Sequence, residues 1–150
     1  MRLSEKINED LKDAMKSGDK TRLAVVRSIR ALILEFEKSG AKKELTSEDE
    51  IKMLSTAAKK RRDSIEQFRN AGRNDLADAE EAELIILTEY LPKQMDESEI
   101  ISEVLRIAAE IGAKTKEDFP KLMPIVMKEL KGKADGKLVK SIVENILVSN

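Results

Sequence analysis

Hydrophobic side chains recur along most of this chain every three or four residues, which is the period of an amphipathic α-helix. The six glycines fall between these stretches, where helices would end or begin. No stretch alternates apolar and polar residues with the period of a half-buried strand. The pattern therefore predicts an all-α protein, with a four-helix N-terminal unit and a small C-terminal three-helix domain.

The N-terminal helical domain is predicted to span residues 1–91. Its first helix places Leu3, Ile7, Leu11 and Met15 on one face, each four residues after the previous one. The second and third helices are long, and we expect them to form an antiparallel pair about 30 Å in length, given a rise of about 1.5 Å per residue.

Short polar side chains predict where several helices begin, because they accept hydrogen bonds from the unpaired N–H groups of a first turn. Ser47 and Glu50 have the spacing of a capping box for the third helix, and Asn74 is placed to cap the fourth. Aspartates are placed to cap the second, fifth and seventh helices: Asp19, Asp96 and Asp135.

Pro92 marks the predicted end of the N-terminal domain, because a proline pushes the preceding residue, here Leu91, out of helical backbone angles. The C-terminal three-helix domain is predicted over residues 95–150. Its second helix, which ends at Leu130, contains Pro124, a residue with no N–H to donate. We expect this helix either to start near Pro124 or to kink there.

The composition narrows the chemistry that the chain can perform. Aromatic residues make up 3% of it, so the core must be aliphatic. There is no Cys and no His, which excludes disulfides, zinc sites of the usual kind, Cys nucleophiles and Ser-His-Asp triads. No glycine-rich phosphate loop is present either. We therefore predict no catalytic residue, no metal site and no cofactor.

The N-terminal residues lack the apolar segment of a signal peptide. No segment approaches the roughly 20 apolar residues of a membrane span. From these two observations we expect a cytoplasmic protein without a membrane partner.

Charge is balanced overall, with 28 bases and 29 acids, but it is segregated along the chain. Residues 52–73 hold seven bases and two acids, whereas residues 74–90 hold six acids and no base. One interpretation is that the acidic fourth helix pairs with its basic neighbours. The other is that Arg61 and Arg62 belong to a phosphate-binding face, because guanidinium groups match phosphate oxygens well.

A second basic run lies in the second helix, where Arg27 and Arg30 are three residues apart and share a face. Aromatic side chains that could stack on unpaired bases are lacking, since Phe36, Phe68 and Phe119 fit core positions. Sequence-specific recognition of single strands is therefore not expected, whereas shape-based binding to a folded RNA stays open.

The turn between the last two helices holds two glycines, one acid and three lysines in seven residues, Lys131–Lys137. Gly132 is expected to take left-handed backbone angles at a helix end, and Asp135 to cap the next helix. The lysines have no such structural role. The turn is either a solvated connection or a phosphate-binding element, because lysines bind phosphates as mobile point charges.

Several motifs follow one another along the chain: Asp10-Leu11-Lys12-Asp13-Ala14-Met15-Lys16, Asp19-Lys20, Arg22-Leu23, Arg61-Arg62-Asp63-Ser64-Ile65-Glu66-Gln67-Phe68, Ala71-Gly72-Arg73-Asn74-Asp75-Leu76 and Glu89-Tyr90-Leu91-Pro92-Lys93-Gln94. In this order they resemble the YqeY family of small free-standing proteins, over essentially the whole chain. The lysine-rich turn, preceded by Met123, Met127 and Leu130, is similar to the tail that this family shares with the GatB subunit of tRNA-dependent amidotransferases.

The resemblance implies a two-part helical fold and a noncatalytic role in binding tRNA or in assisting a tRNA amidotransferase. The family is associated with carbon–nitrogen ligase activity that uses glutamine as amide donor, but this chain shows no residues for that chemistry. The implied partners are tRNA and an amidotransferase or aminoacyl-tRNA synthetase. A protein–protein docking module without RNA contact is the alternative. The candidate RNA-binding residues are Lys121, Lys131, Lys133, Lys137, Lys140, Arg61 and Arg62.

The chain departs from the family pattern at one point. The family places small glycines around the methionine of the penultimate helix, as Gly-Lys-x-Met-Gly. Here Pro120 and Pro124 flank Lys121-Leu122-Met123 instead.

Overall fold

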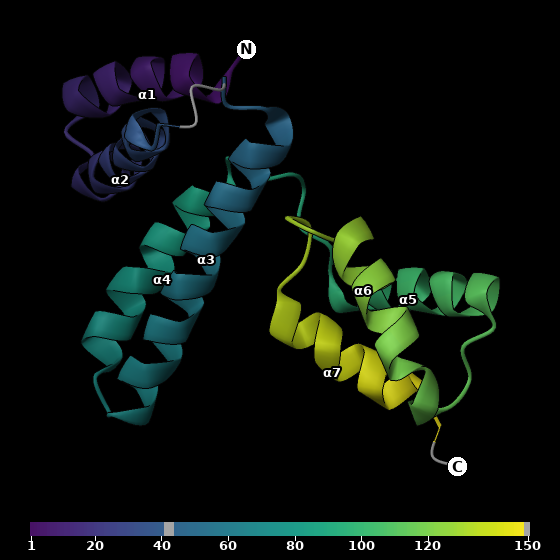
Figure 1. The fold of residues 1–150 in the computed structure, drawn as a ribbon. Coiled ribbons are helices and arrows are strands. Elements are labelled where there is room, and N and C mark those ends of the chain that lie inside the picture. Colours follow the sequence, from purple (N-terminus) through teal and green to yellow (C-terminus); the bar gives the residue numbers. More distant parts are fainter. Residues whose placement is uncertain (41–43, 149–150) are drawn as a thin grey trace. The chain divides into compact units, whose positions relative to one another are not determined.

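The computed structural model describes residues 1–40 and 44–148, and it separates into two compact units, Met1–Pro92 and Lys93–Asn150 (Figure 1). In these described residues the regular structure consists of seven α-helices, one short 3₁₀ helix and a single isolated bridge between two residues. The prediction of an all-α protein is therefore confirmed.

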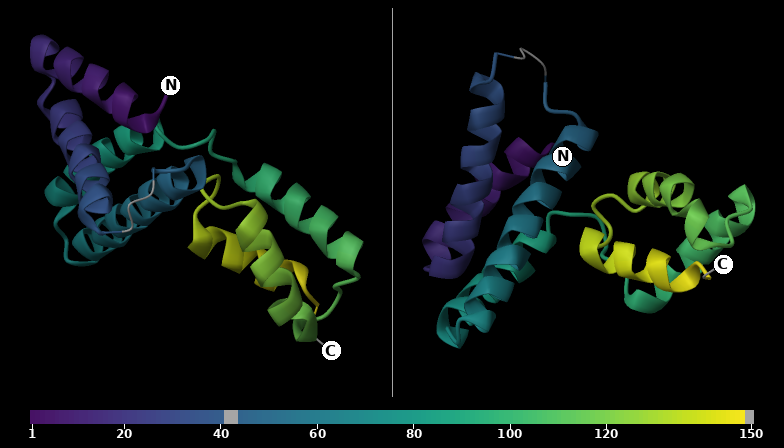
Figure 2. Two further views of the ribbon diagram at one scale, coloured as in Figure 1. Left: turned by 45° about the horizontal axis from the view of Figure 1, so that its top comes forward. Right: turned by 60° about the horizontal axis from the view of Figure 1, so that its bottom comes forward.

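The first unit holds four helices: α1 (Leu3–Ser17), α2 (Lys20–Lys38), α3 (Ser47–Asn70) and α4 (Asn74–Thr88). α1 packs on α2, α3 packs on α4, and α2 also packs on α4. The views agree that α3 and α4 lie side by side (Figure 1, Figure 2). The prediction that α2 and α3 form the main helix pair is wrong, because α2 packs mainly on α1 and α3 packs mainly on α4. Short turns join α1 to α2 and α3 to α4 and hold each pair together, whereas a longer connection separates α2 from α3.

An aliphatic core joins the four helices, as the low aromatic content requires. Its buried members are Leu3, Ile7, Val25, Val26, Ile29, Ile33, Leu54, Ala58, Ile86, Leu87 and Leu91. Met15 was expected in the apolar face of α1 but is 59% exposed, and Ala14 is buried instead. The reason is geometric: a step of four residues advances about 40° beyond a full turn, so the row from Leu3 drifts out of the core by its fourth member.

The capping box of α3 begins one residue earlier than the sequence predicted. Thr46, not Ser47, is the N-cap: its hydroxyl oxygen accepts from Asp49 N at 3.1 Å, and its own N–H donates to the Asp49 carboxylate at 3.1 Å. Glu50, expected in this box, instead accepts a hydrogen bond from Leu3 N at 3.4 Å. This bond ties the start of α3 to the start of α1.

The other predicted N-caps divide into two outcomes. Asp19 caps α2 by accepting from Arg22 N at 3.0 Å, as expected. Asn74 does not cap α4, because the helix already begins there and Arg73 occupies the cap position without a side-chain bond. The turn before α4 is tight: Gly72 takes φ +73°, and Arg73 N donates to Phe68 O at 2.8 Å. Asn74 is already helical, so it does not have the extended backbone that is typical of an N-cap residue.

The second unit holds α5 (Glu97–Ile111), a 3₁₀ turn η1 (Lys116–Asp118), α6 (Phe119–Glu129) and α7 (Gly136–Ile146). The three α-helices pack on one another around a second aliphatic core. Its buried members are Ile100, Val104, Ile107, Ala108, Leu122, Val126, Leu130, Val139, Ile142, Val143 and Leu147. Asp96 caps α5 by accepting from Glu99 N at 2.8 Å, as predicted.

Pro124 lies inside α6 and not at its start, so the first of the two expectations for this proline is wrong. The helix begins at Phe119, directly after η1, and Pro120 occupies its first turn, where a missing N–H costs nothing. Pro124 is exposed. Because Pro124 has no N–H, it cannot make the intrahelical bond to the carbonyl of Pro120 that another residue would make there. A kink at Pro124 stays a prediction.

The three phenylalanines expected in the core are half-buried instead. Phe119 packs against the core of the second unit. Phe36 and Phe68 are only partly covered.

Candidate functional site

The lysine-rich turn connects α6 to α7 and has a defined backbone. Gly132 takes φ +77°, the left-handed conformation expected for it, and is itself buried. Lys133 N donates to Leu130 O at 2.9 Å, which closes the turn after α6. Asp135 caps α7 by accepting from Lys137 N at 3.3 Å, as predicted. The glycine and the aspartate thus have structural roles.

The turn is also anchored from outside by the segment that precedes α5. The side-chain amide of Gln94 donates to Gly132 O at 2.7 Å, and Met95 N donates to Lys133 O at 2.8 Å. Both bonds act on the backbone. They hold the path of the turn.

The start of α7 lies close to α6. A Cβ atom placed on Gly136 would lie 3.3 Å from the Cε of Met127, so the glycine allows the methionine to pack directly against the backbone. The close contact at Gly136 is therefore made by a side chain of α6, the helix that carries Pro120 and Pro124.

The candidate lysines of this unit are all exposed. Lys131 and Lys133 lie in the turn, and Lys137 and Lys140 lie three residues apart in the first turns of α7. Lys121 belongs to the first turn of α6. Four of the five candidates thus fall within residues 131–140, a stretch that includes Asp135, the N-cap of α7.

Arg61 is engaged in the way that the structural interpretation of the charge pattern predicts. Its guanidinium forms ion pairs with Glu80, at 3.2 Å, and with Glu83, both on α4. Arg69 likewise pairs with Asp78 at 3.1 Å and with Glu81 at 2.5 Å. The acidic fourth helix is therefore paired with its basic neighbour α3. The side chain of Arg61 is only 17% exposed, so it has little surface to offer a ligand.

Arg62 is half-buried on the same helix. Its predicted contact with RNA, like that of Arg61, stays a prediction.

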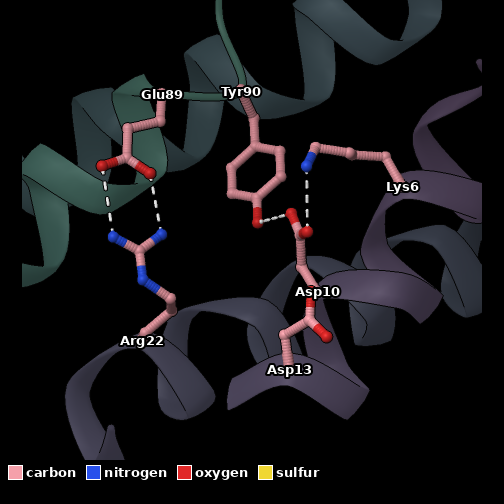
Figure 3. Close-up of a pocket in the computed structure, with 6 residues that line it drawn as sticks. All are labelled: Lys6, Asp10, Asp13, Arg22, Glu89 and Tyr90. Atoms are coloured by element: carbon pink, nitrogen blue, oxygen red, sulfur yellow. Dashed lines mark hydrogen bonds and ion pairs between the residues drawn. The ribbon is translucent and has the colours of Figure 1, made fainter. Parts of the chain in front are cut away.

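A polar cavity of about 390 Å³ lies in the first unit, among α1, α2 and the end of α4 (Figure 3). Its lining comes from distant parts of the sequence: Lys6, Asp10, Asp13, Arg22, Glu89 and Tyr90. Arg22 holds Glu89 through two hydrogen bonds, of 2.8 and 3.3 Å. Asp10 accepts from Lys6 at 2.9 Å and from the hydroxyl of Tyr90.

Burial and bonding move the pKa values of these groups away from neutrality. Burial, together with the hydrogen bond to Asp10, raises the pKa of the Tyr90 phenol well above its ordinary value. Burial alone would raise the pKa of Asp10, but hydrogen bonds from Tyr90 and Lys6 outweigh it and lower that pKa. The hydrogen bonds from Arg22 lower the pKa of Glu89. A general acid or base working near neutral pH needs the opposite shifts, so this cavity has the electrostatics of a binding or structural site.

This cavity was not predicted from the sequence. Asp10, Asp13, Arg22, Glu89 and Tyr90 all belong to the motifs that carry the family resemblance. Their presence in those motifs was the available signal. Their convergence is a property of helix packing and cannot be found from spacing along the chain.

Comparison with known proteins agrees with the helical architecture. The family described as Yqey-like protein matches residues 4–147, almost the whole chain. This chain belongs to the YqeY-like family. The match includes the cavity, the lysine-rich turn and, except for Leu3, both aliphatic cores.

Three fungal proteins are similar to this YqeY-like chain. "Altered inheritance of mitochondria protein 41, mitochondrial" of Pyrenophora tritici-repentis is 33% identical over 146 residues, which are 95% of this chain and 79% of the relative. The protein of the same name from Lachancea thermotolerans is 31% identical over 107 residues, 70% of this chain and 57% of the relative. An uncharacterized protein of Schizosaccharomyces pombe is 36% identical over 87 residues, 58% of this chain and 70% of the relative.

The names of two of these relatives place those proteins in mitochondria. Over residues 1–40 and 44–148 of the YqeY-like chain, no helix is both long enough and apolar enough to cross a membrane.

Proposed function

We propose that this YqeY-like protein is a noncatalytic tRNA-binding protein, which acts on its own or beside a tRNA amidotransferase or aminoacyl-tRNA synthetase. The proposed contact surface is the lysine-rich turn with the first turns of α7, namely Lys131, Lys133, Lys137 and Lys140. Lys121 of α6 is the further candidate. The similarity of this tail to that of GatB suggests tRNA as the RNA.

One observation carries the proposal. The backbone of the turn is held by Gln94 and Met95, through bonds of 2.7 and 2.8 Å to the carbonyls of Gly132 and Lys133. An ordered backbone presents the exposed lysines from fixed positions, so less conformational entropy is lost when they contact phosphates. A connection serving only to join two helices would not need three lysines in seven residues.

The proposed role is noncatalytic because the chain shows no recognisable constellation for amide transfer. Glutamine hydrolysis needs an activated Cys or Ser; the sequence has no Cys, and the serines among the described residues lie in helices or at a helix cap, without a glycine-rich oxyanion setting. In the polar cavity, the pKa of Asp10 is lowered and that of Tyr90 is raised, which suits neither group for proton transfer near neutral pH.

Binding to total tRNA at about 50 to 200 mM salt tests the proposal. Affinity should fall steeply with salt, because contacts with phosphates release counterions. The Lys131→Ala/Lys133→Ala/Lys137→Ala variant should bind more weakly and lose about one unit of the log–log salt slope for each lysine that contacts a phosphate.

A charge-matched control makes the test specific to the turn. The Lys12→Ala/Lys16→Ala/Lys93→Ala variant removes three exposed lysines elsewhere in the chain. It should keep most of the salt dependence of tRNA binding. Equal losses in both triple variants would contradict a site at the turn. If the folded wild-type protein bound no tRNA at the lowest salt, RNA binding itself would be excluded.

A protein-docking module is the second candidate function. Three exposed apolar side chains of the second unit favour it: Leu105 (50% exposed), Ile125 (37%) and Met127 (40%). Isolated exposed apolar residues are normal, so this observation weighs less than the anchored turn. A stoichiometric protein partner that is retained after nuclease treatment, in the absence of tRNA binding, would favour docking.

We propose a cytoplasmic location for the protein. The mitochondrial names of the fungal relatives make a mitochondrial location the competing proposal. Fractionation of cells that express a tagged full-length protein separates the two: recovery in the mitochondrial fraction would contradict the cytoplasmic proposal.

A further inference from the structure

The outer face of α2 carries cations that the fold does not use. Two rows of exposed residues run along it at seven-residue intervals, which repeat the same face of a helix. The first row is Lys20, Arg27 and Leu34, and the second is Ala24, Ala31 and Lys38. Arg30, one turn after Arg27, is exposed beside the first row. We call Lys20, Arg27, Arg30 and Lys38 the α2 cationic stripe.

The two arginines of this stripe differ from most arginines of the protein. Among the residues that the structure describes, neither Arg27 nor Arg30 forms an ion pair. Ion pairs do engage six other arginines: Arg2, Arg22, Arg61, Arg69, Arg73 and Arg106. The charge on this face is therefore uncompensated by the fold.

No acid accompanies these cations along most of the helix. α2 has no acidic residue between Lys20 and Leu34, and its acids, Glu35 and Glu37, come in the last turn. At a rise of about 1.5 Å per residue, Lys20 and Arg27 are about 10 Å apart along the axis. The cations are thus spread along a line and not gathered around one point, which suits an extended anion better than a small one.

The uncharged residues of the face limit what can bind there. Ala24 and Ala31 project little, so an approaching chain can come close to the guanidinium groups of Arg27 and Arg30. Leu34, at 40% exposure, is the one large apolar residue in these rows. That is too little apolar surface for the buried centre of a protein–protein interface. Electrostatic attraction is the main favourable interaction that this face offers.

We infer that the α2 cationic stripe is a second phosphate-contacting surface, on which the sugar–phosphate backbone of a folded RNA lies. Arginine forks bind phosphate oxygens through paired hydrogen bonds, and a face without aromatic residues reads no bases. This inference rests on the proposed RNA binding and extends it from the second unit to the first. It assigns a role to Arg27 and Arg30, which lie neither in the polar cavity nor in the lysine-rich turn.

The test compares full-length variants in tRNA binding across the same salt range. Arg27→Gln/Arg30→Gln removes the two guanidinium groups of the stripe. Arg69→Gln/Arg73→Gln is the control, because it makes the same charge change in the same unit at arginines that already pair with carboxylates. Circular dichroism melts confirm that each variant is folded.

We expect the stripe variant to lose about two units of the log–log salt slope, about one for each cation, and the control to lose much less. Equal slopes for stripe variant and wild type would overturn the inference. So would equal losses in the stripe variant and the control, which would indicate a response to net charge alone.

Combination with the turn variant separates this inference from the proposed function. If only the stripe variant loses slope, the α2 surface stands and the lysine-rich turn fails as an RNA site. If only the turn variant loses slope, the inference fails and the proposed function stands. If polyglutamate binds through Arg27 and Arg30 more tightly than tRNA does at equal salt, the partner is an acidic protein and the inference is overturned.

Discussion

The hydroxyl of Tyr90 donates a hydrogen bond to the carboxylate of Asp10, eighty residues earlier in the chain. The other oxygen of that carboxylate accepts from Lys6 at 2.9 Å. The residue before Tyr90, Glu89, is held by Arg22 of α2. Two adjacent residues at the end of α4 are thereby fixed to α1 and to α2 (Figure 3). This network fixes the chain directly after α4 and leads to the first three predictions.

Tyr90→Phe should destabilise the protein by about 1–2 kcal/mol, because a hydrogen bond to a charged, largely covered carboxylate is lost while the ring is kept. The Asp10 side chain is only 17% exposed, so water replaces the phenol poorly. Urea unfolding followed by circular dichroism measures the change. An unchanged midpoint would show that the bond contributes nothing to stability.

Acid should weaken the same network. The pKa of Glu89 is lowered below its ordinary 4.5 by the hydrogen bonds from Arg22, and that of Asp10 is lowered below 3.8. A carboxyl group whose pKa is lower in the folded than in the unfolded state adds stability above its unfolded pKa and loses that contribution as pH falls through the folded pKa. We therefore expect the free energy of unfolding to decline below about pH 5.

Glu89→Gln isolates one part of this decline. The variant should be less stable than wild type at neutral pH, and the difference should shrink in acid, as the pH falls through the lowered pKa of Glu89. Unfolding curves at neutral and at acidic pH measure it. A difference of the same size at both would contradict the assigned cause.

Thr46→Ala should cost about 1 kcal/mol of stability, because the N-cap of α3 loses the side-chain acceptor for Asp49 N. Ser47→Ala is the matched control, since Ser47 is exposed and lies inside the helix. It should change stability by less than about 0.5 kcal/mol. If Ser47→Ala had the larger effect, the cap would be at Ser47.

Gln94→Glu should loosen the lysine-rich turn. The substitution keeps the length of the side chain but removes the amide that donates to Gly132 O, so a carbonyl of a buried residue loses its bond. We expect a loss of about 1–3 kcal/mol and faster amide hydrogen exchange at Lys133, whose N–H bonds Leu130 O. Unchanged exchange at Lys133 would show that Met95 alone holds the turn.

Periodicity and caps were sufficient to predict most helices. Asp19, Asp96 and Asp135 cap the helices assigned to them, because an N-cap depends on residues within one turn of chain. The errors arose where two local solutions compete. Thr46 and Ser47 can each accept from the first turn, and the bond from Leu3 N to Glu50 is a tertiary contact that favours the box starting at Thr46.

The charge pattern had two interpretations that the sequence could not separate. Helix packing placed Glu80 and Glu83 against Arg61 and left Arg27 and Arg30 facing solvent. Before folding these arginines differ only in their neighbours along the chain. After folding they differ in whether a carboxylate from another helix lies within reach.

The sequence by itself determined the all-helical class, most helix ends and the aliphatic core, because these depend on propensity and on contacts within a few residues. Tertiary structure decided the pairing of α3 with α4, the cavity that joins Asp10 to Tyr90 and the anchoring of Gly132 by Gln94. Each of these depends on atoms brought together from separate helices or connections. Their proximity follows from packing apolar faces in three dimensions, which spacing along one chain does not specify.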